Sequence, residues 1–148
     1  MPAWLPDEFD HPRRVGLPTG HHMRPIRADD VDIDYPAVMG SRERLWAQYG
    51  EAWGWPPATM SIAADREDLA RHEAEAEANE AFNYAIFDAE ETALLGCVYV
   101  DPSDTHDAQV SWWVVDPLVG SALERTLDEF VPRWLRETWG FTNVDYSP

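Results

Sequence analysis

The stretch Ser111–Glu124 most constrains what this chain of 148 residues can fold into. It opens with an apolar run of aromatic and β-branched residues, Trp112–Val115, which is too short to span a membrane and ends at Asp-Pro. Such a run predicts a strand that is buried on both faces. Ser121 followed three residues later by Glu124 has the pattern of a capping box, so we expect a helix to begin at Ala122.

The turn between this strand and this helix is a candidate anion-binding site. Gly120 stands just before the predicted helix start, where backbone amides gather at the positive end of the helix dipole. Gly and Ser are also common turn residues, so an ordinary strand-to-helix connection explains the same spacing. For the anion-binding site, we expect two neighbouring strands to part beside Gly120 and to present main-chain amides to a ligand.

Composition and charge exclude several classes of function. Asp and Glu number 28 against 11 basic residues, and the formal net charge of −17 disfavours nucleic acid as a partner. Every basic residue is an arginine, which excludes Schiff-base chemistry, pyridoxal phosphate attachment and a Walker A loop. No apolar run approaches the roughly 20 residues of a membrane span and the N-terminus lacks a secretory signal, so we expect a soluble cytoplasmic protein. The single cysteine, Cys97, is predicted to be a small buried hydrophobe.

The first 22 residues differ in composition from the rest. Residues 1–22 are rich in proline and predict an irregular N-terminal arm, whereas residues 23–148 predict a single domain. His11, His21 and His22 lack the Cys or carboxylate spacing of a zinc site, so no metal is expected.

Two further stretches lead to a candidate substrate pocket. Met23–Arg27 predicts a short edge strand, because Pro25 cannot donate to a central ladder. Residues 31–54 predict one or two short helices, broken near Gly40 and Gly50. Their aromatic residues either line a substrate pocket or form the core of a helical layer. These residues are Trp46, Tyr49, Trp53 and, just beyond, Trp55.

The centre of the chain predicts a helix and a hairpin. Asp65 is predicted to begin a helix that runs to about Ala81, with Asp68 as its capping partner. Residues 83–88 and 92–101 predict two antiparallel strands. Gly96 in the second strand indicates a bulge or the close approach of another backbone or of a ligand.

The last third of the chain predicts strand, helix and strand. Residues 108–115 are predicted to form a strand that includes the apolar run Trp112–Val115. The helix that follows is predicted to kink or split at Pro132 and to end at Gly140. Residues 141–146 have the right length for one last strand. In order, the elements predict a mixed, mostly antiparallel α+β (α/β) sheet with helices on both faces.

Read in this order, the chain resembles the GNAT acyltransferase superfamily over residues 23 to about 146. The segments that carry the resemblance are Arg24–Asp30, Leu95–Val100, Trp112–Pro117, Val119–Leu123 and Gly140–Phe141. The resemblance implies a GNAT-like sheet whose C-terminal part is truncated, because the family's final hairpin is missing. It also implies that an exposed last strand is covered by the arm or a partner chain, and we expect a homodimer.

The resemblance implies acetyl-CoA as co-substrate. The strand residues Trp113, Val114 and Val115 would face its pantetheine arm, and the turn after them would hold its pyrophosphate. The turn residues and the cation expected to help them are Gly120, Ser121, Ala122 and Arg125. The family's motif has a Gln or Arg where this chain has Pro117. In a second alignment, the helix start matches and the phosphate loop has been deleted.

The resemblance also directs attention to candidate catalytic residues. Gln109 stands where members of the family often carry a glutamate base, and an amide cannot take up a proton. The nearest substitutes are Asp107, His106 and Glu80, each of which is equally explained as a solvated residue. The expected substrate-binding residues are Trp46, Tyr49, Trp53, Trp55 and Tyr84.

Three functions compete on this sequence. The first is an N-acyltransferase that moves an acetyl group from acetyl-CoA to a small amine, mainly by orienting the two reactants. An acidic, tryptophan-rich pocket would favour a cationic or aromatic amine. The second is a catalytically inactive GNAT-fold module that binds a small ligand or a protein partner. The third is an enzyme that uses the cleft between the strand at residues 108–115 and the last strand for chemistry unrelated to acyl transfer.

Overall fold

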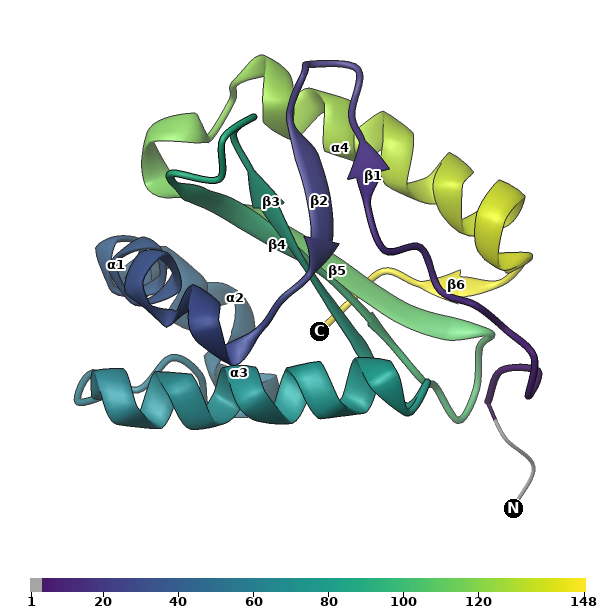
Figure 1. The fold of residues 1–148 in the computed structure, drawn as a ribbon, viewed down its shortest axis with the longest axis horizontal. Helices are drawn as coiled ribbons and strands as arrows, with labels where there is room; N and C mark the ends of the chain where they lie inside the picture. The colour runs from purple at the N-terminus through teal and green to yellow at the C-terminus, as the bar shows by residue number, and fades with distance from the viewer. Residues whose placement is uncertain (1–3) are drawn as a thin grey trace.

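The sheet at the centre of the molecule has strands that lie in space in the order in which they occur in the sequence (Figure 1). The structure is a computed structural model that describes residues 4–148, so the first three residues of the predicted arm lie outside the described residues. Neighbouring strands are antiparallel, except β5 and β6, which are parallel. The strands are β1 Val15–Gly16, β2 His22–Pro25, β3 Phe82–Phe87, β4 Leu94–Asp101, β5 Ala108–Val114 and β6 Val144–Asp145.

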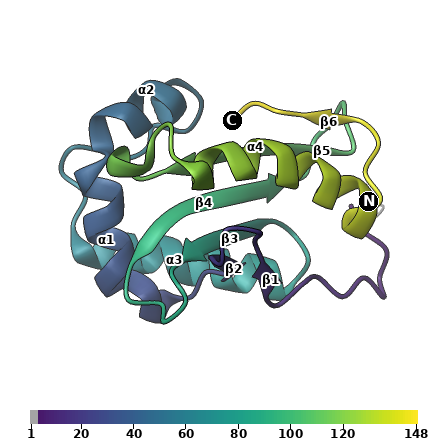
Figure 2. The same ribbon diagram turned by 90° about the horizontal axis from the view of Figure 1, so that it is seen from above.

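Helices cover both faces of this sheet, with α3 and α4 on opposite sides (Figure 1). The helices are α1 Val31–Gly40, α2 Arg42–Trp53, α3 Ile62–Glu77 and α4 Ala122–Trp134, with short 3-10 turns at Ala28–Asp30 and Asp116–Leu118. In both views α1 and α2 lie together at one end of the molecule (Figure 1, Figure 2). This confirms the predicted mixed sheet with helices on both faces. Among the described residues, no helix is long and apolar enough to cross a membrane.

Strand β5 contributes to a separate hydrophobic core on each face. Val110 and Val114 pack with Leu127 of α4, and Trp113 packs with Leu45 of α2. Successive side chains of a strand point to opposite faces, so the unbroken apolar run Trp112–Val114 is what two cores require. The prediction that this strand is buried on both faces is confirmed.

Helix α3 begins three residues earlier than predicted. Ser61 has an extended backbone, and its hydroxyl accepts a 3.0 Å hydrogen bond from the amide of Ala64. This cap makes Ser61 the N-cap, so the predicted start at Asp65 was wrong. Asp65 lies inside the helix with a buried side chain. The helix ends at Glu77 rather than near Ala81, and Asn79 follows in the left-handed region.

The predicted break near Gly50 is absent from α2. Gly50 lies inside the helix. The indole of Trp46 occupies the space that a side chain at Gly50 would need, since a Cβ there would lie 2.7 Å from that ring. Gly54, in the left-handed conformation, ends the helix instead. The other predicted break, near Gly40, is confirmed, since α1 ends there.

Strand β2 is interior rather than an edge strand, because β1 pairs with it. Pro25 is tolerated there because β1 reaches only Met23, which leaves Pro25 beyond that pairing. The residues before β2, expected to be irregular, thus include a short strand, and Leu5 and Leu17 are buried in the core beneath α4.

The C-terminal part departs from expectation in the length of its last strand. Helix α4 runs past Pro132 and changes to a π-type turn, Leu135–Trp139, which ends at Gly140 in the left-handed conformation. Strand β6 is only two residues long, shorter than the predicted 141–146, and pairs with Ala108 and Gln109 at the start of β5. The rest of β5 therefore has no strand along its outer edge.

Candidate functional site

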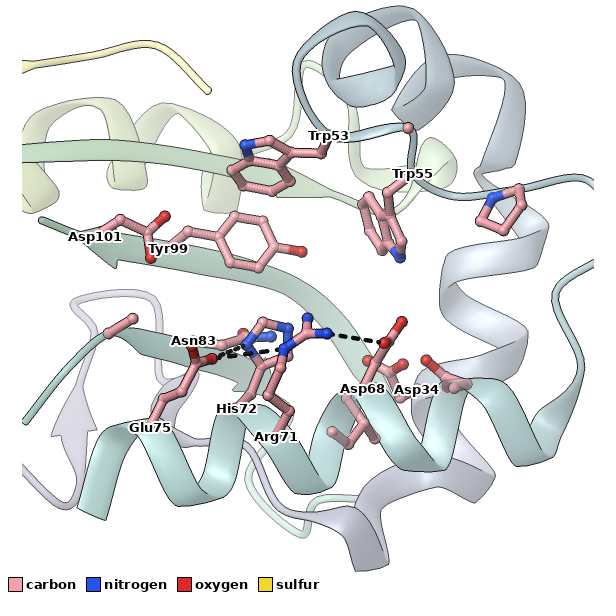
Figure 3. Close-up of a pocket in the computed structure, with 15 residues that line it drawn as sticks. Asp34, Trp53, Trp55, Asp68, Arg71, His72, Glu75, Asn83, Tyr99 and Asp101 are labelled. Atoms are coloured by element: carbon pink, nitrogen blue, oxygen red, sulfur yellow. Dashed lines mark hydrogen bonds and ion pairs between the residues drawn. The ribbon is translucent and has the colours of Figure 1, made fainter. Parts of the chain in front are cut away.

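A cavity of about 440 Å³ lies between α3 and the face of β3 and β4. Trp53 at the end of α2 and Trp55 in the loop after it close the side opposite α3 (Figure 3). The cavity is therefore lined by segments that are far apart in the sequence, and its charged and amide side chains come from α1, α3, β3 and β4.

Carboxyl groups dominate the polar lining of this cavity. Helix α3 presents one face to the cavity. Asp68, His72 and Glu75 follow Asp65 at three, seven and ten positions, a spacing that places all four on the same side of a helix. The carboxyl residues are Asp65, Asp68 and Glu75 from α3, Asp34 from α1 and Asp101 from β4. Arg71, the one arginine in the lining, lies 3.4 Å from Asp68 and 3.8 Å from Glu75. The cavity is therefore strongly acidic.

Asp101, the last residue of β4, is the carboxyl group best suited to proton transfer. Burial and, secondarily, the negative charge of Glu75 raise the pKa of Asp101 to about 7. A general base is most effective when its pKa lies near the working pH. Asp101 pairs with Gln109 across β4 and β5, so it stands one strand away from the position where the resemblance places a base.

Asp34 and Asp65 form a buried carboxyl pair. Burial raises the pKa of Asp34 well above its usual value, and a hydrogen bond to Asp65 raises it further. Burial also raises the pKa of Asp65, although the bond from Asp34 opposes this. Two carboxyl groups that are hydrogen-bonded to each other in a buried site share a proton, because it is costly for both to be charged there.

Two uncharged polar groups complete the lining. Burial, and then the charge of Arg71, lower the pKa of His72 to about 4, so its imidazole is neutral near pH 7. The side-chain oxygen of Asn83 accepts no hydrogen bond from any group in residues 4–148, and Asn83 is only 4% exposed. A buried amide oxygen without a donor is costly, so this atom favours a ligand that donates.

Aromatic rings form the wall opposite the acids. The ring of Trp53 lies 5.1 Å from that of Tyr99 in an edge-on contact, and Trp55 lies 6.4 Å from Trp113. The indole of Trp113 donates a 2.9 Å hydrogen bond to the Tyr99 hydroxyl, which fixes both rings. Aromatic faces next to carboxylates suit an organic cation, which gains from both charge and cation–π attraction.

Only two of the five residues predicted to bind substrate line this cavity: Trp53 and Trp55. Tyr49 is buried behind Trp53, where its hydroxyl donates to Ser111. Trp46 is 42% exposed and lies under the guanidinium of Arg42. Tyr84 faces the opposite core, and its hydroxyl donates to a backbone carbonyl of the arm.

The three predicted catalytic residues lie away from the cavity. Asp107 accepts hydrogen bonds from the amides of Thr142 and Asn143, which lower its pKa and tie the last segment to β5. His106 contacts the neighbouring hydroxyl of Thr105, 2.8 Å away. Glu80 is exposed after the end of α3. Asp107 and His106 thus make local contacts, and none of the three side chains lines the cavity.

Side chains of α2 occupy the outer edge of β5. Gln48 donates a 3.2 Å hydrogen bond to the carbonyl of Trp112, and Arg44 donates to the carbonyl of Val114. Of the strand residues expected to face pantetheine, Val114 directs its carbonyl to this edge, where Arg44 occupies it, whereas the amide of Val115 donates to the carbonyl of Leu95 on the other side. A ligand that pairs with this edge must displace the two side chains.

The turn after β5 also has its own partners. The amide of Gly120 donates a 2.9 Å hydrogen bond to the carboxylate of Glu124, and the Ser121 hydroxyl caps the amide of Glu124. Arg125 donates to the carbonyl of Gly120. Ala122 begins α4, as predicted. An internal carboxylate thus holds one amide that would contact a phosphate.

The sequence contained a signal for the missed residues. Asp68, His72 and Glu75 fall on the α3 face that also carries the buried Leu69, a combination that places polar groups against the core. Asp101 ends an apolar strand, which buries its carboxyl partly.

Comparison with known proteins shows that the fold of this chain is similar to that of solved acetyltransferase structures. No protein-family profile matches the sequence, and no curated protein matches it significantly. Among solved structures, ribosomal-protein-S5-alanine acetyltransferase from Vibrio fischeri is 15% identical, with a TM-score of 0.64 over 92% of this chain and 70% of that one. A ribosomal L7/L12 alpha-N-protein acetyltransferase in complex with coenzyme A is 15% identical, with a TM-score of 0.67 over 83% and 68%.

A third similar structure is a spermidine N-acetyltransferase from Vibrio cholerae in complex with CoA and spermine. It is 12% identical, with a TM-score of 0.61 over 85% of this chain and 69% of that one. At such identities the likeness establishes the fold alone. The chain has the fold of the GNAT N-acetyltransferases, and it spans about 70% of the length of these three.

Proposed function

We propose that this chain is an N-acyltransferase that transfers an acetyl group from acetyl-CoA to a small-molecule amine held in the acidic cavity. The observation that carries the proposal is the position of Asp101, a carboxyl group with a pKa of about 7 in the wall of an acidic, aromatic cavity. The fold supports the reaction class, because the similar structures are named as N-acetyltransferases.

Acetyl-CoA supplies an activated acetyl group as a thioester. In the proposed reaction Asp101 takes the proton from the bound ammonium, which leaves a neutral nitrogen with a free electron pair. This nitrogen attacks the thioester carbonyl, and the C–N bond forms as the C–S bond breaks. The second proton that the nitrogen loses as it becomes an amide goes to the departing sulfur, so coenzyme A leaves as the thiol. Holding both reactants in place supplies several kcal/mol of the rate enhancement, and the base adds a further factor of about 10² to 10⁴.

The residues around the outer edge of β5 fit the co-substrate once the side chains of Gln48 and Arg44 move. Gln48 and Arg44 cap carbonyls that a pantetheine amide would otherwise use. Arg44 lies beside Asp116 and Arg125 beside Gly120, so two guanidinium groups stand near the turn where a pyrophosphate would sit. These two arginines replace, in the proposal, the cation that the turn itself lacks.

Thermal shift and thiol release test the proposal. Acetyl-CoA at about 100 times its dissociation constant adds roughly 2.7 kcal/mol, which raises the melting temperature by several degrees. Mixing with a primary amine should then release free thiol. Gly120→Val should abolish the shift, because Gly120 has a φ of +77° that a β-branched residue adopts only with strain. Val119→Ala, a change at the exposed neighbouring position, is the matched control.

A specific observation favours a second candidate, a GNAT-fold protein that binds an amine without acetylating it. The Gly120 amide and the β5 carbonyls already have partners within the protein. If acetyl-CoA leaves the melting temperature unchanged while an amine raises it, the binding protein is the correct interpretation and the acyltransferase is not.

The homodimer remains a prediction. It rests on the outer edge of β5, which β6 covers at only two residues. Light scattering at several protein concentrations measures the oligomeric state directly, and a monomer at every concentration would contradict the prediction.

A further inference from the structure

A second cavity, of about 360 Å³, lies between the N-terminal arm, the end of β2 and α3. It shares no lining residue with the acidic cavity. Glu73 and Glu77 line it, and each stands two positions from Glu75 on α3, a separation that turns a helix by about 200°. The two cavities therefore lie on different sides of this helix. The other residues that line the second cavity are His11, Arg13, Pro25, Ile26, Arg27 and Ala76.

A buried histidine gives the second cavity a hydrogen-bond acceptor. The Nδ1 atom of His11 lies 3.3 Å from the side-chain oxygen of Asn79, whose amide nitrogen donates to the carbonyl of Phe9. This orientation makes the Asn79 oxygen an acceptor, so the His11 proton is on Nδ1 and a lone pair is on Nε2. Burial and, secondarily, the charge of Arg13 lower the pKa of His11, so its imidazole is neutral near pH 7.

The Nε2 atom of His11 has no partner within the described chain. His11 is 6% exposed, and among residues 4–148 the hydrogen-bond partner of its side chain is Asn79 alone. Because His11 lines the second cavity, the accessible part of its ring faces that space. Buried acceptors are normally paired, so this atom favours a ligand that donates a hydrogen bond.

Glu73 supplies a carboxylate that is held in place. Its Oε1 atom accepts a 3.0 Å hydrogen bond from the amide of Ala28, in the turn that follows β2. Across the described part of the chain, neither Glu73 nor Glu77 forms an ion pair. The second oxygen of Glu73 and the carboxylate of Glu77 are therefore available to a positive group of a ligand.

Two arginines provide the opposite charge. Arg27 forms no ion pair with a carboxylate of the residues that the structure describes. Arg13 lies 3.0 Å from Asp10, but both side chains are largely exposed, and such a surface pair contributes little. Arg13 also donates to the carbonyl of His11, which keeps its guanidinium beside the cavity. The second cavity thus carries two positive and two negative groups that are not paired with one another.

This balance of charge selects a zwitterion. A phosphate would lie beside two glutamates and a simple amine beside two arginines, so either ligand would meet like charge. An amino acid has an ammonium group, which donates to carboxylates and to an imidazole nitrogen, and a carboxylate, which accepts from a guanidinium. Pro25, Ile26 and Ala76 add an apolar surface that suits an aliphatic side chain. In the part of the chain that the structure describes, no three His, Cys, Asp or Glu side chains are grouped so that they could hold a metal.

We propose that the second cavity binds a free aliphatic amino acid, with its ammonium at Glu73 and His11 and its carboxylate at Arg27. This ligand is not the acetyl acceptor, because Asp101 lines the other cavity. It contacts the arm and α3 at the same time, so its binding joins two segments that are far apart in the sequence. The site does not depend on acetyl transfer.

Calorimetric titration without acetyl-CoA tests this site. The probes are leucine and isocaproate, which has the same side chain and carboxylate as leucine but no ammonium group. We expect leucine to bind at least about tenfold more tightly than isocaproate, because the ammonium group gains charge-assisted hydrogen bonds.

Variants assign this preference to the named residues. Glu73→Gln should weaken leucine binding at least about tenfold, and the new amide oxygen can still accept from Ala28, so the fold is kept. Arg27→Gln, at an exposed position, should weaken leucine binding to a similar extent. Glu67→Gln removes the same charge as Glu73→Gln from an exposed position of α3 and should leave leucine binding unchanged.

The outcomes separate this site from the acidic cavity and from the proposed function. No leucine binding, or equal binding of leucine and isocaproate, would overturn the site. Leucine binding that Asp68→Asn weakens and Glu73→Gln does not would place the ligand in the acidic cavity and would also overturn it. Leucine binding that Glu73→Gln weakens, in a protein that never releases thiol from acetyl-CoA, would support the site and contradict the acyltransferase.

Discussion

Asp101 and Gln109 are partners across the antiparallel strands β4 and β5. Gln109 stands where the resemblance to GNAT enzymes places a basic carboxylate, and the chain has an amide there. Asp101 provides a carboxyl group one strand away, on the wall of the acidic cavity. We infer that the base has moved to the neighbouring strand, and this relationship yields the first prediction.

Asp101→Asn should lower kcat/KM for acetyl transfer by about 10² to 10⁴, because an amide cannot accept the proton of the ammonium. In the wild-type protein the rate should rise with pH up to a midpoint near 7, the pKa of Asp101. The variant should lose this midpoint. A pH profile of kcat/KM measures both effects, and an unchanged midpoint in the variant would rule out Asp101 as the base.

The same substitution should affect stability in a pH-dependent way. The pKa of Asp101 is raised in the folded protein, so its contribution to stability is fully present below about pH 4 and is lost as the pH rises through 7. Asp101→Asn should therefore stabilise the protein by about 1–3 kcal/mol at pH 8 relative to its effect at pH 4, after allowance for partial exposure. Urea denaturation at the two pH values measures the difference.

Gln48→Ala should tighten the binding of acetyl-CoA. The Gln48 amide donates to the carbonyl of Trp112, and this bond must break before pantetheine can pair with β5. Removing one competing hydrogen bond of about 0.5–1.5 kcal/mol should lower the dissociation constant by roughly twofold to tenfold. Glu51→Ala, an exposed change on the same helix, is the control. Weaker binding in the Gln48 variant would mean that the coenzyme does not use this carbonyl.

Glu91→Gln should destabilise the protein at neutral pH. Glu91 lies in the turn between β3 and β4 and contacts Arg24 at 3.0 Å and His22 at 2.6 Å, and these partners lower its pKa to about 2. A depressed pKa contributes stability above about pH 4.5 that is lost as the pH falls towards 2. We expect a loss of about 1–2 kcal/mol at pH 7, discounted for partial exposure.

The neighbouring Glu90 provides the control for this prediction. Glu90→Gln removes the same charge at an exposed position and should change stability by less than about 0.5 kcal/mol. The difference between the Glu91 variant and the wild-type protein should shrink when unfolding is measured near pH 3. A difference that stays constant between pH 7 and pH 3 would show that the charge is not the cause.

Gly96→Ala should be among the most destabilising single-methyl changes in the sheet. A Cβ at Gly96 would lie 2.2 Å from the backbone carbonyl oxygen of Trp113, and a backbone atom of the adjacent strand has little freedom to move. We expect a loss of about 3 kcal/mol or more, visible as a lower melting temperature. Gly40→Ala, where nothing lies within 4 Å, should be neutral or stabilising.

The order of elements could be predicted from the sequence because each strand and helix has its own pattern. The apolar run Trp112–Val114 has no polar face, and Ser121 begins a helix whose apolar positions recur at helical spacing. Gly96 was interpreted as a bulge or a close approach, and the structure has both: the register with β3 shifts beside Gly96, and a Cβ there would meet the backbone of Trp113. Such signals are local, and local signals suffice to place elements.

The cavity could not be predicted because its parts come together only in three dimensions. Asp34, Asp65 and Asp101 belong to three different elements, and nothing in their sequence neighbourhoods indicates that they share a space. The tryptophans were a partial success: Trp53 and Trp55 line the cavity, while Trp46 lies on the surface. Its position depends on Gly50, whose missing side chain lets the Trp46 ring lie against the helix.

The Trp4 indole donates a hydrogen bond to the carbonyl of Asp107, and its ring stacks on Phe141. Because every strand pairs with the strand made immediately before it, the sheet can grow one strand at a time as the chain leaves the ribosome. The contact of Trp4 with Phe141 is different, since it has to wait until almost the whole chain has been synthesised. A chain that ends before Phe141 would therefore have most of its sheet but would lack the contact between Trp4 and Phe141.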